Sequence, residues 1–537
     1  MIPRAAAIAR QAFADSPLKH PRYRYFYLGS VATAIGYTMQ ATVAAWLMAT
    51  LTTSTLMVAL VQTASTAPTL VFGFAAGTLS DIVDRRRVII ATQAGLFSCA
   101  ALLGAAALLD IVVPVLLLLL VFATGACFTF YQPAQQSSIN ELVGRSELPK
   151  AVALNAVAFN VARAIGPALA GLMAATLSSG NALAVSAAFF VPMGLAMLRT
   201  SYRAKALPGV PETLWSGIQA GLRYARHSPA MRAFVFRNLA FALCASVFWA
   251  LLPLIARDLL KTDAGGFGLL SATFGLGAVS GALSIPRLLK SQSLDSIATT
   301  AGLLFVAAAG LLATTHLVSL ALLGAFCTGM SWTTVFATLS AGTQSTAPAW
   351  VRARAVAINF VAVQTAIALG SVGWGLVAAL AGLRWTLAGA AALGIVFHLF
   401  NRRFPVAMGT EADVTPGARL PDMALSVEPL PDDGPVLIQI EYRIDAQNRD
   451  AFLAAIQEAG PTRRRNGATS WRVFRDLAED GRYVERFVIA SWAEFLRLRS
   501  RMTVADRALQ ERAESLQRAD VPIRISRLLG VKLVDAD

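Results

Sequence analysis

Long apolar runs alternate with short polar breaks over the first 404 residues of the chain. A membrane-spanning helix needs roughly 20 mainly apolar residues to cross a hydrocarbon core about 30 Å thick. Twelve runs approach or exceed that length, and each is predicted to be a membrane-spanning helix. The predicted spans are 26–50, 56–79, 88–109, 111–130, 150–176, 182–199, 233–256, 266–288, 296–315, 317–340, 355–380 and 385–401.

After Phe404 the pattern changes to that of a soluble domain. Residues 405–432 are rich in Pro, Gly and Asp, which predicts a linker. Beyond the linker, alternating and helical patterns predict, in order, Val436–Ile444 as a strand, Gln447–Ala459 as a helix, Thr469–Asp476 and Tyr483–Trp492 as strands, 493–518 as a helix and Ile523–Leu529 as a strand. The order βαββαβ is typical of a ferredoxin-like α+β domain.

Two sequence motifs recur at an offset of 204 residues. Lys150-Ala-Val-Ala-Leu-Asn155 returns as Arg354-Ala-Val-Ala-Ile-Asn359, and Gly73-x-x-x-Gly77-x-Leu79-Ser80 returns as Gly277-x-x-x-Gly281-x-Leu283-Ser284. The offset pairs span two with eight and span five with eleven, which indicates a duplicated six-helix bundle. Many secondary transporters are built from such repeats and bind their cargo between them.

The predicted domain boundaries follow from this duplication. The chain divides into bundle 1–200, an interbundle linker 201–232, bundle 233–404, the linker 405–432 and a soluble domain 433–537. Within the interbundle linker, Leu214 to Tyr224 is predicted to be an amphipathic helix on the membrane surface. The fold class is therefore an all-α membrane protein of twelve helices with a C-terminal α+β domain.

Composition and charge support a membrane protein. Hydrophobic residues make up 56% of the chain and charged residues 14%, against about 25% charged residues in soluble domains. Up to residue 420 there are 28 Lys and Arg against 12 Asp and Glu, and after it 18 against 19. The positive excess lies in alternate connections, which predicts that both termini are cytoplasmic. The expected location is the inner membrane of a bacterium. It therefore argues for orientation rather than for nucleic-acid binding.

Arg163 is the most informative charged residue in the apolar spans. It lies thirteen positions after Lys150, or about 20 Å along a helix and so near mid-membrane. A cation there is costly and is expected to face a cavity. Polar residues at related positions complete a candidate substrate cavity, namely Asn155 and Asn160 in span five and Asn359 and Gln364 in span eleven. Alternatively, Arg163 bonds to backbone carbonyls or Asn side chains and holds helices together.

Gly166-Pro167 and Gly171 follow Arg163 in span five. A Gly-Pro step bends or loosens a helix, and neighbouring helices make this tolerable in a membrane. Span eleven keeps Gly370 and Gly375 but has Ser371 in place of the proline. These small residues are interpreted either as a helix bend or as sites of close helix packing.

Span two ends in a glycine-rich, charged segment. Gly77, Asp81, Asp84 and the cluster Arg85, Arg86, Arg87 form a candidate gate at the cytoplasmic ends of the helices, or merely a topology signal. No carboxylate lies in the core of a predicted span. Proton coupling would therefore use an end-of-span carboxylate such as Asp81 or Asp258, and coupling to another ion or none stays open. No metal or cofactor motif is found.

The motifs together resemble a known transporter family. Gly77-Thr-Leu79-Ser-Asp81 with Arg85–Arg87, Tyr131-Gln-Pro133-Ala134, Gly166-Pro167 and Gly275-x-Gly277-x-x-x-Gly281 are similar to motifs of the major facilitator superfamily, in the branch of the enterobactin exporter and the transmembrane secretion effectors. The resemblance implies that Asp81 latches the bundles, and that Gly166-Pro167 is linked to export. It further implies alternating-access efflux of small organic molecules such as siderophores, anionic metabolites or antibiotics.

The tail has its own resemblance. Arg463–Ala468, Trp471, Glu485-Arg486-Phe487 and Ser491–Glu494 are similar to transporter tails that resemble small dimeric α+β barrels, some of them monooxygenases. This implies self-association or regulation, or alternatively a membrane-tethered enzyme. Because the tail has no histidine, cysteine or cofactor fingerprint, an enzyme is not expected. A third alternative is lipid or lysophospholipid flipping by the helical body. The expected partners are a small-molecule substrate and the lipid bilayer.

Overall fold

The computed structural model describes residues 16–144, 147–199, 214–417 and 429–531. The chain forms two compact units. The first unit comprises Met1–Gly209, Arg237–Thr338 and Phe360–Phe404, and the second comprises Val210–Phe236, Leu339–Asn359 and Pro405–Asp537. Parts of the predicted linkers, 201–213 and 418–428, lie outside the described residues.

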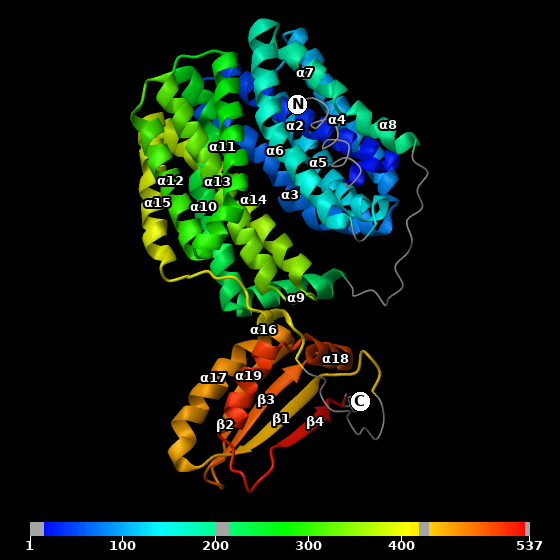
Figure 1. Cartoon of the computed structure of the whole chain (residues 1–537), viewed down its shortest axis with the longest axis vertical. Helices are drawn as coiled ribbons and strands as arrows, with labels where there is room; N and C mark the ends of the chain where they lie inside the picture. Colours follow the sequence, from blue (N-terminus) through cyan, green and yellow to red (C-terminus); the bar gives the residue numbers. More distant parts are fainter. Residues whose placement is uncertain (1–15, 145–146, 200–213, 418–428, 532–537) are drawn as a thin grey trace, which may run out of the picture. The chain divides into compact units, whose positions relative to one another are not determined.

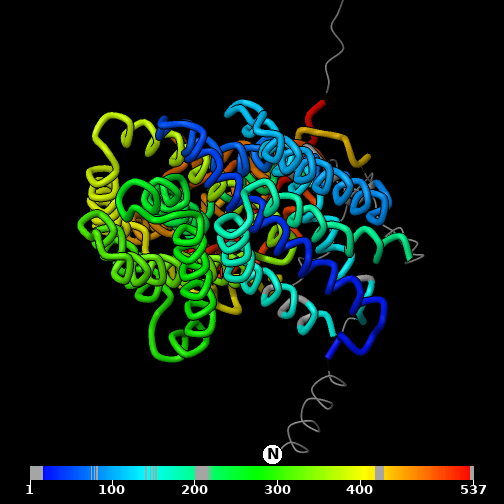
Figure 2. Tube along the Cα trace, turned by 90° about the horizontal axis from the view of Figure 1, so that it is seen from above, coloured from blue at the N-terminus to red at the C-terminus, as the bar shows by residue number. Residues whose placement is uncertain are grey.

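The first unit is helical. Its first half contains α2 (Pro21–Leu51), α3 (Thr55–Ile82), α4 (Arg85–Leu108), α5 (Pro114–Leu142), α6 (Leu148–Thr176), α7 (Ser179–Ala188) and α8 (Val191–Arg199). Its second half contains most of α10 (Pro229–Leu254), a π-helical turn (Ile255–Leu259), α11 (Ala264–Ser291), α12 (Leu294–Thr314), most of α13 (Val318–Thr346) and α14 (Arg352–Ala381), and α15 (Leu383–Asn401). Figures 1 and 2 show the two halves as two groups of helices, blue to cyan and green to yellow.

Eleven segments of the described residues are long and apolar enough to cross a membrane. They coincide with the second to twelfth predicted spans, with α7 and α8 together forming the sixth. The first predicted span is also helical, as α2, but it is not among the eleven. This helix buries several polar residues among its apolar ones, namely Ser30, Thr33, Gln40 and Thr42.

Side-chain caps define where several of these helices begin. Ser54, Asp84, Ser178, Asp263 and Ser293 each accept a hydrogen bond from a backbone N–H in the first turn of the next helix. Such caps satisfy donors that a helix start leaves unpaired. We call the end of the unit with residues 52–54, 109–113, 177–178 and 260–263 the short-loop end. The end with residues 83–84, 292–293 and the Arg85–Arg87 cluster is the basic end.

Equivalent glycines bring helices into backbone contact in both halves. A Cβ on Gly125 of α5 would lie 2.5 Å from the carbonyl oxygen of Ser65 in α3. A Cβ on Gly329 of α13, 204 residues later, would lie 1.9 Å from the carbonyl oxygen of Phe274 in α11. Small residues allow this close approach where the bilayer supplies no hydrophobic force between helices. The duplication therefore repeats the packing of the second helix of each half on the fourth.

The second unit combines a four-stranded sheet with helices. It contains α9 (Leu214–His227), α16 (Glu411–Val414), β1 (Val436–Arg443), α17 (Arg449–Asn466), β2 (Ala468–Arg475), β3 (Arg482–Ile489), α18 (Trp492–Arg501), α19 (Val504–Glu514) and β4 (Arg524–Leu529). The strand order is β2-β3-β1-β4, and every neighbouring pair is antiparallel. Buried residues of β1 such as Ile440 pack with Phe452 of α17 and Phe495 of α18, so these helices share one core with the sheet.

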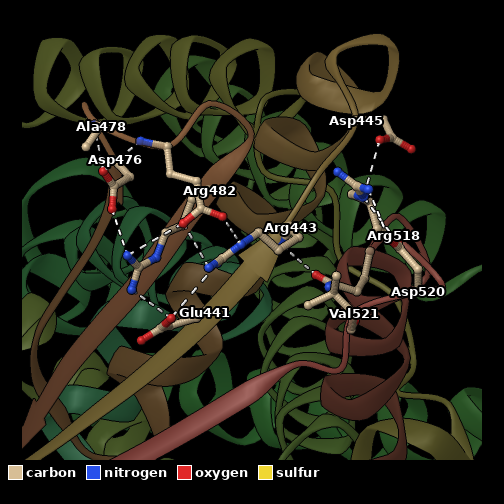
Figure 3. Close-up of polar contacts among 11 residues, drawn as sticks. Glu441, Arg443, Asp445, Asp476, Ala478, Arg482, Arg518, Asp520 and Val521 are labelled. Atoms are coloured by element: carbon tan, nitrogen blue, oxygen red, sulfur yellow. Dashed lines mark hydrogen bonds and ion pairs between the residues drawn. The ribbon is translucent and has the colours of Figure 1, made fainter.

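Two details of this unit differ from the sequence-based expectation. The predicted helix 493–518 is two helices, because Thr503 and Asp506 form a capping box that starts α19. The predicted linker 405–432 contains α16, and Pro416 pairs with Thr503 in an isolated β-bridge. At the turn after β2, Arg482 bonds to Asp476 and Glu441 (Figure 3), which ties the β2–β3 hairpin to β1.

Candidate functional site

A cavity of about 280 Å³ lies inside the first unit between its two halves. Its walls come from α2, α3, α5 and α6 in the first half and from α10, α11, α13 and α14 in the second. Among the described residues that line it, none is acidic. Membrane-embedded bundles commonly bind small ligands at such an interface between repeats.

The wall from the first half carries most of the polar groups of the cavity, beside the aromatic residues Tyr37, Phe128 and Phe159. Hydroxyl and amide groups line it on three helices, namely Thr38, Thr42, Gln62, Ser65, Thr66, Thr69, Thr129 and Gln132. Part of this hydrogen-bonding capacity is used internally, since the Thr66 hydroxyl donates to the carbonyl of Gln62 at 3.0 Å and Thr69 bonds to Thr129 at 3.1 Å. The wall can still accept or donate through the remaining lone pairs and amide groups.

The wall from the second half is aromatic. Trp249, Phe267, Trp332 and Phe360 line the cavity. Trp249 packs edge-on against Trp332 with ring centroids 5.9 Å apart, and both rings contact Phe274 behind them. Such edge-to-face pairs hold rings in defined orientations. The cavity thus has aromatic residues on both sides, while most of its hydroxyl and amide groups come from the first half.

Arg163 of α6 lines the cavity, as the sequence analysis expects. Among the described residues, the structure records one partner for its guanidinium, the ring of Phe159, whose centroid is 5.0 Å from Cζ. This cation–π contact stabilises the charge by about 0.5–2 kcal/mol but does not neutralise it. With no acidic residue in the described lining, the guanidinium can bind an anionic group of a ligand.

The other predicted cavity residues divide into two groups. Gln364 lines the cavity from α14. Asn155 and Asn359 take part in helix packing, because Gln135 of α5 donates to Asn155 Oδ1 at 2.8 Å and Asn359 donates to Thr343 of α13 at 3.1 Å. Asn160 is half-buried in α6 and is not among the described residues that line the cavity.

Gly166, Pro167 and Gly171 shape the packing of α6. The helix continues through Pro167, which lines the cavity. Since proline has no N–H, the carbonyl of Arg163 loses its usual helical donor, and this oxygen would be 2.6 Å from a Cβ on Gly275 of α11. Gly166 allows the Thr38 hydroxyl to approach and donate to the carbonyl of Ala162 at 3.0 Å.

Contacts between the halves gather toward the short-loop end. Gly171 of α6 faces Gly268 of α11, where an added Cβ would lie 2.6 Å from the opposite Cα. On the other side of the unit, Thr55 donates to the carbonyl of Gly375 and Thr63 to that of Ala368, each at 3.0 Å. These bonds connect α3 with α14, so two helix pairs hold the halves together at this end.

A charged contact adds to these bonds at the same end. Arg257, in the π-helical turn after α10, forms a two-fold ion pair with Asp258 at 2.7 and 2.9 Å. Its third nitrogen donates to the carbonyl of Thr52 in the first half at 3.4 Å. The predicted end-of-span carboxylate Asp258 is thus paired with an arginine that reaches across the halves.

The residues of the predicted latch have different surroundings. Gly77 and Asp81 lie in the last two turns of α3, and the side chain of Asp81 is outside the described part. Asp84 caps α4 by accepting from the N–H of Arg86 at 2.9 Å. Arg86 donates to the carbonyls of Met197 and Leu198 at the end of α8 at 2.7 and 2.9 Å, a favourable position for a cation. Arg85 is half-buried and Arg87 exposed.

The polar motif residues of the C-terminal tail form a buried cluster. Glu485 of β3 is 0% exposed and accepts from Arg463 at 3.1 Å, Trp471 Nε1 at 2.9 Å and Tyr442 at 3.1 Å. A buried carboxylate needs such partners to stay ionised. Three donors from one helix and two strands satisfy it, so these motif residues support the domain core.

The polar stripe of α3 and the aromatic residues of the cavity were not predicted from the sequence. Gln62, Ser65, Thr66 and Thr69 recur at intervals of three and four residues in an otherwise apolar span, a helical pattern that marks one face. The aromatic residues carry no comparable signal, because an aromatic ring in an apolar span is equally consistent with a lipid-facing or a core position.

Two known transporters are similar to this chain in sequence. It is 27% identical to the multidrug efflux pump Tap of Mycolicibacterium fortuitum over 353 residues, 64% of this chain and 85% of that protein. It is 21% identical to the staphyloferrin A transporter of Staphylococcus aureus over 270 residues, which make up 50% of this chain and 67% of that protein.

Solved structures share the fold of the helical part. A bacterial homologue of the human lysosomal transporter Spinster, inward-facing and unoccupied, superimposes with a TM-score of 0.59 at 12% identity, covering 71% of this chain and 97% of that one. The nucleoside transporter NupG superimposes with a TM-score of 0.55 at 14% sequence identity, and the match covers 71% of this chain and 98% of NupG. The sequence profile of the transmembrane secretion effectors matches residues 12–533. The chain therefore belongs to the transmembrane secretion effector family of the major facilitator superfamily.

Proposed function

We propose that the protein exports small organic molecules across the inner membrane of a bacterium by alternating access. The observation that carries the proposal is the cavity between the halves, with a guanidinium at Arg163 and aromatic rings opposite. The efflux direction is supported by the similarity to Tap, a multidrug efflux pump. Siderophores, anionic metabolites and antibiotics are the candidate cargoes, and the staphyloferrin A transporter is a related siderophore carrier.

The cargo is held by both walls. An anionic or strongly polar group bonds to Arg163 and to neighbouring hydroxyl groups, while an apolar or aromatic part stacks on Trp249 and Trp332. Gln364 supplies a further hydrogen bond from the second half. Charge-assisted bonds to a guanidinium are about twice as strong as neutral ones, so removing the anionic group from a cargo weakens its binding most.

Alternating access uses the two ends of the helical unit in turn. The bonds of Thr55 and Thr63 to α14 and the contact between Gly171 and Gly268 hold the short-loop end together. Cargo enters from the basic end, and the short-loop contacts break when the halves rock apart. Asp81, Arg85 and Arg87 near Gly77 and Asp84 form the latch of the other state, with Arg86 fixing the adjacent helix ends.

The membrane arrangement follows from helix count and charge. Twelve helices cross the membrane, because α2 has 31 residues and covers the first predicted span in addition to the eleven apolar segments. Both termini are cytoplasmic, because the basic residues gather at alternate connections. The C-terminal domain has the ferredoxin-like arrangement, which its β1-α17-β2-β3-α18-α19-β4 order supports, and it regulates transport or mediates self-association.

The test is transport into inverted membrane vesicles. A panel of fluorescent anionic, neutral and cationic amphiphiles is offered with and without a pH gradient of either sign. We expect concentrative uptake of anionic compounds, which requires the chain and disappears when the gradient that drives it is collapsed. Absence of gradient-dependent uptake for every compound, from protein shown to be folded, would refute the efflux proposal.

A further inference from the structure

A group of arginines from distant parts of the chain converges in the second unit at the end of α9. Arg226 and His227 end that helix, and Arg232 lies in the first turn of α10. Arg464 comes from the last turn of α17, more than 200 residues later. Arg226, Arg232 and Arg464 are exposed. We call these three residues, together with His227, the arginine cluster.

Contacts of the neighbouring residues fix this convergence. Arg465, next to Arg464, lies over the ring of Tyr224 with its Cζ 5.8 Å from the centroid. Arg223 of α9 bonds to Glu494 of α18 at 3.5 Å. The C-terminal domain therefore packs on α9 through α17 and α18, and this packing brings Arg464 close enough for its charge to act on His227.

Within the part of the chain that the structure describes, no carboxylate pairs with the three arginines of the cluster. Burial lowers the pKa of His227, and the charges of Arg464, Arg226, Arg232 and Arg223 lower it further. The nearby carboxylates Glu494 and Asp506 are already paired with other arginines. Arg464 lies over the ring of Trp471, with its Cζ 5.9 Å from the centroid, a contact that leaves its charge in place. Like charges held together without counter-ions favour a bound anion.

The position of the cluster indicates which kind of anion it would bind. Arg232 lies in the first turn of the apolar segment Pro229–Leu259, so the cluster lies where a membrane-spanning helix meets water. One turn before Arg226, Leu222 is 62% exposed, and an apolar residue beside cations on an amphipathic helix is typical of contact with a lipid surface. Orientation signals explain Arg226 and Arg232 but not Arg464, because Arg464 belongs to a domain far from any span in sequence.

We propose that Arg226, Arg232 and Arg464 bind the phosphate headgroup of an anionic membrane lipid. The lipid would bridge α9, α10 and the C-terminal domain, and so couple docking of that domain to the charge of the membrane. The proposal is independent of the cargo of the cavity. A soluble phosphate compound would satisfy the same guanidinium groups, and the experiment separates the two sources.

The test is lipid binding to the full-length protein by native mass spectrometry in neutral detergent. Dioleoylphosphatidylglycerol is titrated against dioleoylphosphatidylcholine, with inorganic phosphate as the soluble arm. We expect each of R226Q, R232Q and R464Q to weaken phosphatidylglycerol binding by roughly fivefold, as loss of one basic residue near an anionic surface does, and to leave phosphatidylcholine binding unchanged. R464K should retain binding. R472Q, a neutralised exposed arginine on β2, is the matched control and should bind as the wild type.

Two results would overturn the proposal. If R464Q binds phosphatidylglycerol as tightly as the wild type and as R472Q, the domain contributes nothing to the site. If millimolar inorganic phosphate displaces the lipid as effectively as excess phosphatidylglycerol does, the site recognises a soluble phosphate and not a lipid. A circular dichroism spectrum and thermal midpoint equal to those of the wild type establish that R464Q is folded.

Discussion

Arg163 and Ile367 occupy equivalent positions of the repeat, 204 residues apart, and line the same cavity from opposite halves. The first half presents a cation at this position and the second an aliphatic side chain. The duplication therefore supplies two matching helices, α6 and α14, while the chemistry at their centre has diverged.

Replacing Arg163 by Ile tests whether this cation binds cargo. R163I gives the first half the side chain of the second, and we expect transport of anionic compounds to fall about 10- to 100-fold, as loss of a charge-assisted hydrogen bond predicts. Neutral compounds should change far less, and R163K should keep part of the activity. Uptake into inverted vesicles measures this, with R287Q at an exposed arginine of α11 as the control.

The thermal stability of R163I shows whether Arg163 serves as an anchor that binds cargo or as a structural residue that holds helices together. An unpaired charge in a membrane cavity costs free energy, so R163I should raise the thermal midpoint of the purified protein. If Arg163 instead holds helices together, its removal would lower that midpoint. Reduced transport with reduced stability would therefore contradict the anchor role.

Thr63 supports a second prediction, about the short-loop end. T63V removes the hydrogen bond to the carbonyl of Ala368 in the opposite half, and each such bond contributes about 1 kcal/mol. We expect roughly a fivefold shift toward the state open at this end. The measurement is the labelling rate of a cysteine placed at cavity residue Ser271, in a background without native cysteines, with an impermeant maleimide added outside.

A matched threonine on α14 controls for the loss of a hydroxyl. Thr365 donates within its own helix, to the carbonyl of Val361 at 2.8 Å, so T365V leaves the bonds between the halves intact. Labelling should stay at the wild-type rate in T365V. Equal rates in T63V and T365V would show that the Thr63 bond does not hold this end together.

A third prediction concerns two glycines, whose replacement by alanine should have different effects on stability. In G268A the new Cβ would lie 2.6 Å from the Cα of Gly171 and 2.8 Å from the carbonyl oxygen of Pro167. Overpacking of this kind typically costs about 1–3 kcal/mol. A Cβ on Gly310 of α12 would meet no atom within 4 Å, so G310A should be neutral or stabilising by up to about 1 kcal/mol.

Thermal unfolding followed by tryptophan fluorescence compares the two glycine variants. We expect a lower midpoint for G268A than for the wild type, and an unchanged or higher one for G310A. A neutral G268A would mean that α6 and α11 can separate at this point without loss of stability.

The sequence predicted the helices and strands well where a periodic pattern is long. The predicted strand Val436–Ile444 corresponds to β1 at Val436–Arg443, and span eight at 266–288 lies within α11. Helix ends were less accurate, because a helix continues past its apolar core as long as its backbone bonds are made. Span ten at 317–340 extends to Thr346 as α13 for this reason.

The candidate site was only partly predictable. A charged residue near the middle of an apolar span is easily recognised in the sequence, and Arg163 does line the cavity. The repeated asparagines Asn155 and Asn359 do not, because their motif records packing on the preceding helix. One sequence shows which residues recur at equivalent positions but not which face of each helix the cavity uses. In this duplicated bundle, the asparagines that recur in both halves take part in helix packing, whereas the cation of the cavity stands at a position where the two halves differ.

Glu494 gives a pH dependence for the contact between α9 and the C-terminal domain. Burial raises the pKa of this carboxyl, but Arg501, Arg497 and Arg223 around it have the larger combined effect, so the pKa lies below its ordinary value. A group whose pKa is lowered by folding stabilises the folded state fully above its unfolded pKa, about 4.3 for glutamate. That contribution is lost as the pH falls through the lower folded pKa.

Hydrogen exchange of α9 measures this dependence. We expect the protection of residues 214–227 to fall on acidification below about pH 4.3, and E494Q to show reduced protection already at neutral pH, by about 1–2 kcal/mol. The variant should also lose most of the pH dependence. E511Q, which breaks an exposed pair with Arg507 on α19, should behave as the wild type, since such surface pairs contribute about 0.3–0.5 kcal/mol. An E494Q profile that follows the wild type through the whole range would show that Arg223 and Arg501 do not need this carboxylate to hold the domain on α9.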